Sequence, residues 1–176
     1  MKEYLNSRFK AAVIDYFCII IYLIMLFVIS MGLYFYVNDE VPKYSEASLH
    51  VVSFFTTFLP VVLYFSIKEG LYPYQSFGKK LMKLHINYKS NPLRSSFIRN
   101  IIKFLPWQIA HIAIIVGAYH AFDLVIVIIL FGIAFLLPII YILMIIFNKN
   151  HRSLADIIAN ADVVIVDNNT NNESSK

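Results

Sequence analysis

The sequence predicts an all-α protein, a polytopic transmembrane bundle of about four membrane-spanning helices with short amphipathic helices on its cytoplasmic side. Two observations lead to this fold class. The 176 residues are 59% hydrophobic and only 15% charged, whereas an average soluble domain is about 45–50% apolar. Four apolar stretches also approach the roughly 20 residues that a helix needs to cross a hydrocarbon core of about 30 Å. The chain is therefore expected to be embedded in a membrane.

The expected spans cover residues 11–37, 49–67, 97–119 and 124–147. The first is too long for the apolar region of a signal peptide and no cleavage site follows it. The third is the least regular, because Arg99 and Lys103 lie in its first turns and Pro106 can bend it. Residues 1–166 thus form one membrane domain. The polar tail, residues 167–176, has no apolar side chains to bury and is expected to be disordered.

The orientation follows from the lysines and arginines between the spans. Of the fifteen, only Lys43 lies in the first connection, and with four spans the other fourteen all fall on one side. The positive-inside rule assigns that side to the cytoplasm. Both termini are therefore expected to be cytoplasmic.

Asp15 is a carboxylate inside the first span, where burial in hydrocarbon costs several kcal/mol unless it is compensated. Helical spacing places Arg8, Asp15 and Tyr22 on one stripe. Asp15 is a candidate proton or cation site, since intramembrane carboxylates commonly mark ion pathways. The alternative is an ion pair with Arg8, Arg99 or Lys103 that holds helices together.

The second span carries a seam of hydroxyl groups on one helical face. Its members are Ser53, Thr56, Thr57 and Tyr64. They are a possible polar lining of a pathway. Serine and threonine also let helices approach closely and hydrogen-bond across their contact, so a role in packing is the alternative.

The connection after the second span combines lysines with apolar residues such as Phe77, Leu81 and Ile86. This composition is typical of a helix lying on a membrane surface, where each lysine would gain about 1 kcal/mol from anionic headgroups. The positive-inside rule alone also explains the cluster. Lipid headgroups account for the positive charge, so no nucleic-acid partner is expected.

The chain lacks the parts of an enzyme or a metal site. Cys18 is the single cysteine, and His120 and Asp123 stand one turn apart without a third ligand. No nucleophile motif and no suitably spaced pair of carboxylates occurs. We expect no catalytic residue, no metal and no cofactor.

Four patches follow one another in a recognisable order. Arg8 precedes Asp15 by seven residues, and "QSFGKKLMKLHI", "LRSSFIRNIIKFLP" and "HRSLADIIANADVVIV" follow. In this order the chain resembles the RDD family of bacterial membrane proteins, which is named for an arginine and two aspartates. The resemblance implies Arg8, Asp15 and Asp156 as the family residues, with Gly78-Lys79 and Arg152 in support and Arg99 in the third patch.

The resemblance also has departures. This chain has Tyr74 and Lys83 where the family often has glycine, and Asn160-Ala161-Asp162 replaces a Gly-Thr step. Glycine allows backbone conformations that other residues adopt only with strain. At these positions the chain is therefore expected to differ from the backbone arrangement that the glycines of the family allow.

The tail segment is expected to form a short amphipathic helix. Arg152 and Asp156 would be i, i+4 neighbours on it, with Leu154 and Ile157 on its apolar face. It would lie near Arg8 and Asp15, so that an Arg/Asp network joins the start of the chain to its end.

Two functions remain open. The first is transport of a proton, a small cation or a small solute, which the resemblance also suggests. The second is a non-catalytic membrane scaffold or accessory subunit that binds anionic lipid or a partner protein. Because four helices are few to enclose a conduit, transport implies a homo-oligomer or a partner membrane subunit.

Overall fold

The computed structural model describes residues 2–37 and 44–166. The predicted disordered tail and most of the first connection lie outside these residues. Within them, four helical segments are long and apolar enough to cross a membrane. They are α1 (Lys2–Val37), the continuous run of α2 (Glu46–Ser53), η1 (Phe54–Phe58) and α3 (Leu59–Gly70), then α5 (Pro92–Tyr119) and α6 (Val125–Phe147). The predicted helical bundle is confirmed.

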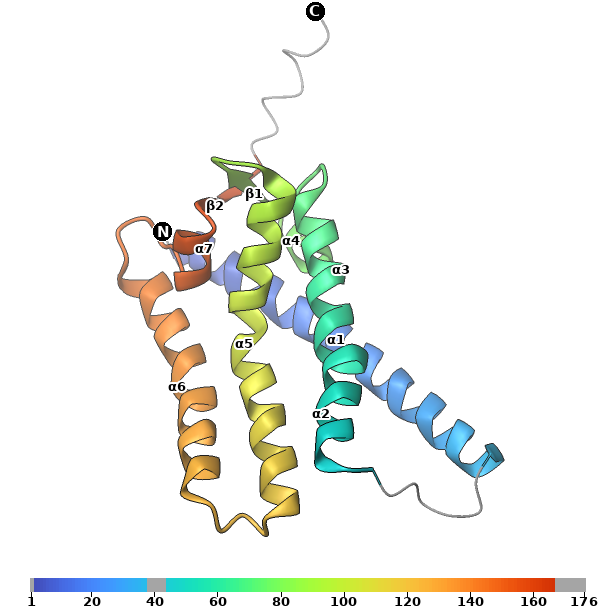
Figure 1. The fold of residues 1–176 in the computed structure, drawn as a ribbon. Coiled ribbons are helices and arrows are strands. Elements are labelled where there is room, and N and C mark those ends of the chain that lie inside the picture. Colours follow the sequence, from blue (N-terminus) through green and yellow to red (C-terminus); the bar gives the residue numbers. More distant parts are fainter. Residues whose placement is uncertain (1, 38–43, 167–176) are drawn as a thin grey trace, which may run out of the picture.

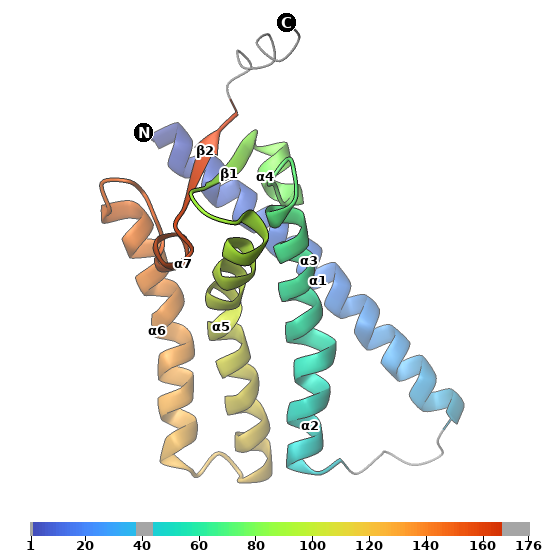
Figure 2. The same ribbon diagram turned by 45° about the horizontal axis from the view of Figure 1, so that its top comes forward.

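The long helices are not all parallel. The α2–α3 segment, α5 and α6 run side by side, whereas α1 crosses them obliquely and diverges from α2 at its far end (Figures 1 and 2). The large side chains on that far half of α1, such as Phe27 and Val28, are exposed. The start of α1 instead packs among α4 (Phe77–Leu81), α7 (Leu154–Ile158) and two short strands. We call this end of the bundle the capped end and the opposite end the loop end.

Two of the three prolines inside the spans are each matched by a tyrosine from a neighbouring helix. Proline has no N–H, so the carbonyl four residues before it loses its helical donor. Pro60 frees the carbonyl of Thr56, which accepts the hydroxyl of Tyr22 at 2.6 Å. Pro106 frees that of Ile102, which accepts the hydroxyl of Tyr141 at 3.2 Å. The wider π-helical turn η1 lies directly before Pro60, a common way to absorb such a break. These bonds tie α1 to η1 and α5 to α6.

The capped end contains a small sheet that the sequence analysis did not anticipate. The expected surface helix reduces to the five residues of α4, and β1 (Leu84–Tyr88) pairs antiparallel with β2 (Ala161–Ile165). Leu84 and Ile86 alternate with more exposed residues and are fully buried. Burial with period two is the signature of a strand packed on one face. Ile86 therefore lies in a core under α1 rather than on the membrane surface.

The residues that replace the glycines adopt a backbone conformation that glycine favours. Tyr74, Lys83 and Asn160 all adopt the left-handed conformation, with φ of 58°, 54° and 49°. Residues other than glycine reach this region at a cost of roughly 1–2 kcal/mol. The turns that glycine would favour are thus retained here with larger side chains.

Candidate functional site

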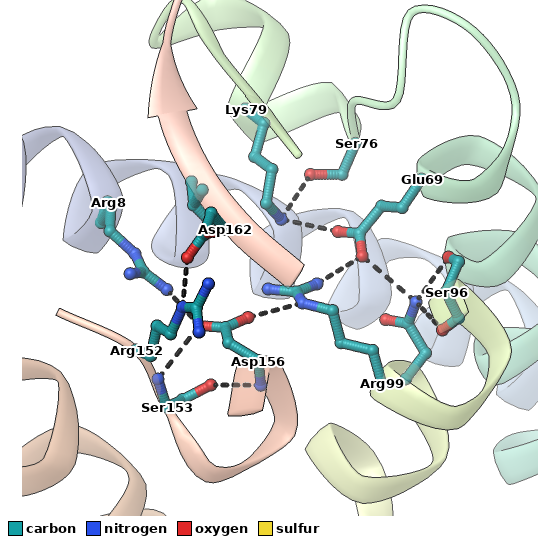
Figure 3. Close-up of polar contacts among 12 residues, drawn as sticks. Arg8, Glu69, Ser76, Lys79, Ser96, Arg99, Arg152, Ser153, Asp156 and Asp162 are labelled. Atoms are coloured by element: carbon teal, nitrogen blue, oxygen red, sulfur yellow. Dashed lines mark hydrogen bonds and ion pairs between the residues drawn. The ribbon is translucent and has the colours of Figure 1, made fainter. Parts of the chain in front are cut away.

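Six charged side chains form a continuous chain of alternating sign at the capped end. They are Arg8, Asp156, Arg99, Glu69, Lys79 and Asp15, in the order of their contacts. Figure 3 shows the part of this chain from Arg8 to Lys79. We call the six side chains the charge network. It contains three acids and three bases, and it draws on α1, α3, α4, α5 and α7. Residues separated by more than 140 positions therefore meet in one buried cluster.

Asp156 lies between Arg8 and Arg99 in the network. One of its carboxylate oxygens accepts Arg8 at 2.8 Å and the other accepts Arg99 at 2.7 Å. Asp156 also accepts the backbone N–H of Ser153, whose hydroxyl accepts the N–H of Asp156, a capping box that starts α7. Burial alone would raise the pKa of Asp156, but the charges of Arg99 and Arg8 outweigh it and hold that pKa well below its ordinary value. The carboxylate is therefore ionised at neutral pH.

Glu69 is the centre of the network, and the sequence analysis missed it. It is fully buried and accepts Arg99 at 2.5 Å, Lys79 at 2.6 Å and the amide of Asn100 at 3.1 Å. Next to Lys68 at the end of a span, it resembles an ordinary interfacial charge. A signal was present, because Glu69 lies four residues after Phe65 and so on the same helical face as that buried ring.

Asp15 is held in a different way from the expectation. Its oxygens accept the hydroxyl of Ser76 at 2.6 Å and the backbone N–H of Gly78 at 2.8 Å, and Lys79 is the nearest cation at 3.8 Å. The expected partners were Arg8, Arg99 or Lys103, and none of them pairs with Asp15. The N-cap residue Ser76 and the first residues of α4 supply the contacts instead.

Gly78 lies so close to α1 that a side chain does not fit. A Cβ atom at this position would stand 2.1 Å from the carbonyl oxygen of Ala11 and 2.9 Å from Oδ1 of Asp15. The absence of a side chain lets the N–H of Gly78 reach the carboxylate. The Gly78-Lys79 step thus stabilises Asp15 in two ways. Gly78 donates its backbone N–H to the carboxylate, and Lys79 places its ammonium beside it.

The prediction that Arg152 lies on the tail helix as an i, i+4 neighbour of Asp156 was wrong. α7 begins only after Ser153, so Arg152 precedes the helix and is not an i, i+4 partner of Asp156. Its guanidinium instead donates to Asp162 on β2, which Lys89 also contacts at 3.5 Å. Arg152 therefore links the segment just before α7 to the sheet, beside the charge network.

The threonines of the hydroxyl seam hydrogen-bond within their own helix. Thr56 and Thr57 both donate to carbonyls one turn earlier, those of Val52 and Ser53. Threonines that bond back in this way bend helices, which fits their position in the wider turn η1. Tyr64 is the exception, because it lines a cleft on the α1 side.

This cleft lies between α1 and α3 and has a volume of about 410 Å³. Its walls are Cys18, Ile19, Tyr22, Pro60, Val61, Tyr64 and Phe65. Cys18 lies one helical turn beyond Asp15, and Phe65 lies one turn beyond Glu69. The cleft is therefore the space next to the charge network on its loop-end side. Its walls are mostly apolar.

The comparison with protein families matches residues 4–160 to the RDD family. The chain belongs to the RDD family. The match extends from α1 to the end of α7, so it contains every member of the charge network. Neither the curated proteins nor the solved structures that were compared contain a match. Together with its four long apolar helices, family membership identifies a membrane-embedded protein.

The three residues that the family resemblance implied all belong to the charge network. Arg8 and Asp156 bind each other directly, and Asp15 joins them through Lys79, Glu69 and Arg99. Removing one member of a buried ion pair leaves its partner uncompensated, at a cost of about 3–5 kcal/mol. In this RDD chain the network ties the first helix to the last helix and to α3, α4 and α5.

Proposed function

We propose that this RDD protein is a non-catalytic transport component that holds a small solute in the cleft between α1 and α3. The observation that carries the proposal is the cleft itself. Its volume of about 410 Å³ falls within the range of about 300–1,000 Å³ that is usual for small-molecule sites. Cys18 and Phe65 of its walls also lie one helical turn from Asp15 and Glu69 of the charge network.

A solute fits the site better than a bare proton or cation. Both oxygens of Asp15 already accept hydrogen bonds, from Ser76 and Gly78, with Lys79 beside them. A cation would have to displace these donors, whereas the cleft is bounded mainly by carbon and two tyrosine hydroxyls. An enclosed route also requires more helices than one chain supplies. The exposed far half of α1 is our candidate contact for a second copy or a partner membrane subunit.

We further propose that the capped end faces the cytoplasm of a bacterial cell, in the inner or plasma membrane. Lys80, Lys83 and Lys89 belong to this end, which fits the positive-inside rule. Anionic headgroups are then the expected partners of these lysines. The α5–α6 turn and the start of α2 lie on the outer side.

Thiol labelling of intact cells tests this orientation. In a background with Cys18 replaced, we expect Ser45→Cys to react with an impermeant thiol reagent and Ser90→Cys to remain unreactive until the cells are opened. Both serines are exposed in the described residues, so access and not burial decides the result. The opposite labelling pattern would reverse the proposed orientation.

Transport is tested by flux into vesicles of reconstituted protein. The panel contains Na⁺ and K⁺, followed with an internal pH dye, and three organic solutes that share one decyl chain and carry a sulfonate, an alcohol or a trimethylammonium group. Cys18→Phe fills the cleft, and Cys18→Ala is its matched control because it leaves the cleft open. We expect at least about tenfold slower organic solute flux in the phenylalanine variant and unchanged flux in the alanine variant.

The scaffold function is the alternative outcome of the same assay. It is favoured by the saturated charge network, which resembles a structural lock more than a pathway. If no member of the panel is transported by correctly inserted protein, the transport proposal fails and a lipid-binding or partner-binding scaffold replaces it.

A further inference from the structure

Lys103 is a cation in a membrane span that the charge network does not neutralise. Its ammonium lies 4.6 Å from the ring centre of Phe65 and 4.9 Å from that of Phe104. Among residues 2–37 and 44–166, no acid forms a salt bridge with it and no acceptor is within hydrogen-bond range. The three acids of the network are already matched by three bases, so Lys103 carries one positive charge in excess. Ring faces attract such a charge but do not cancel it.

The position of Lys103 places this charge at the cleft. Lys103 lies one helical turn beyond Arg99, as Phe65 lies one turn beyond Glu69 and Cys18 beyond Asp15. The three residues thus belong to the layer of the bundle next to the network. Lys103 does not itself line the cleft, but Phe65 both lines the cleft and contacts the ammonium, so the charge lies one side chain away from the cleft.

We propose that the cleft takes a single-chain amphipathic anion, with its head group paired to Lys103 and its apolar chain along the cleft between α1 and α3. The walls of the cleft match the chain, and the unpaired ammonium matches the head group. A volume of about 410 Å³ suits one small molecule better than a two-chain phospholipid. This inference rests on the cleft of the proposed function and names its class of solute.

The single tryptophan of the chain offers a direct reporter. Trp107 lies one turn beyond Lys103 and contacts Phe104, with ring centres 6.3 Å apart. Both aromatic rings belong to the cluster at which α1, α3 and α5 meet. A bromine atom on a bound chain should therefore quench the fluorescence of Trp107.

The experiment titrates the full-length protein in phosphatidylcholine nanodiscs with ω-bromodecanesulfonate, whose charge is permanent. The matched probes are ω-bromodecanol and ω-bromodecyl trimethylammonium. The variants are Lys103→Met, Lys103→Arg and Cys18→Phe, with the exposed lysine of α4 in Lys80→Met as the control for general charge. Lys103→Met removes the charged hydrogen bond to the head group, so we expect it to weaken sulfonate binding about tenfold or more. Lys103→Arg and Lys80→Met should keep it.

Several outcomes would overturn the inference. One is equal and saturable quenching by all three probes, and another is equal sulfonate binding by Lys103→Met and wild type. If Lys103→Met does not fold, Cys18→Phe decides, because a filled cleft must abolish saturable sulfonate quenching. Brominated phosphatidylglycerol in the nanodisc tests whether a phospholipid is bound instead. If this lipid quenches Trp107 in a Lys103-dependent way and the sulfonate does not, a single-chain anion is contradicted. Sulfonate binding without flux would contradict the transport proposal but support the anion site. Flux that does not depend on Lys103 would support the transport proposal but contradict the anion site.

Discussion

Glu69→Gln is expected to destabilise the folded protein by about 3–5 kcal/mol, the usual cost of leaving buried charges uncompensated. Glu69 is fully buried and accepts both Arg99 and Lys79. The neutral amide would leave these two cations close together without their shared acid. The free energy of unfolding in mild detergent, followed by circular dichroism, measures the effect.

The matched control is Glu46→Gln. Glu46 also contacts two basic side chains, His50 and His120, but at 3.8 Å and 3.4 Å and with its side chain 34% exposed. Exposed pairs of this kind are worth about 0–1 kcal/mol. If Glu69→Gln were as mild as Glu46→Gln, the network would not hold the capped end together.

Gly78→Ala is the second variant for which we expect a large loss, about 3 kcal/mol, at the upper end of what overpacking usually costs. The added methyl group would meet the backbone carbonyl of Ala11 at 2.1 Å, and backbone cannot move aside as a side chain can. α4 would have to retreat from α1, which would also lengthen the bond from the N–H of Gly78 to Asp15. Thermal unfolding in detergent is the measurement.

Gly132→Ala provides the comparison within a membrane span. A Cβ atom there meets nothing within 4 Å. Alanine in a helix is about 0.5–1 kcal/mol more favourable than glycine, so this variant should be as stable as wild type or slightly more stable. A loss of stability as large in Gly132→Ala as in Gly78→Ala would show that packing against α1 is not the reason for Gly78.

The membrane spans could be predicted from sequence because the requirement for a span, a long apolar run, is a property of the linear sequence. A helix in hydrocarbon needs a long apolar run, and such runs are visible without knowledge of any neighbour. Arg8, Asp15 and Asp156 were found through the order of motifs in the RDD family. That Arg8 would lie near the tail was also anticipated, and the hydrogen bond from Tyr4 to the carbonyl of Val163 adds to the same junction.

The partners of these residues could not be predicted, because each depends on a tertiary contact. Arg99 donates to Glu69 as well as to Asp156, and the neighbourhood of Glu69 in sequence resembles a membrane boundary. Asp15 is compensated by a loop hydroxyl and a backbone N–H, and no sequence pattern announces the latter. β1 and β2 were missed since strands of five residues gain stability only by pairing, and their partners lie more than 70 positions apart.

The tie between the two ends of the chain is measured most directly by a double-mutant cycle on Arg8 and Asp156. The single variants Arg8→Gln and Asp156→Asn and the double variant are compared with wild type by their free energies of unfolding in detergent. Because the two side chains are 2.8 Å apart and only 11% and 0% exposed, the changes should be non-additive, with a coupling of about 1–3 kcal/mol. Changes that add to within about 0.5 kcal/mol, as is usual for residues that do not touch, would contradict a direct link between the first helix and the last.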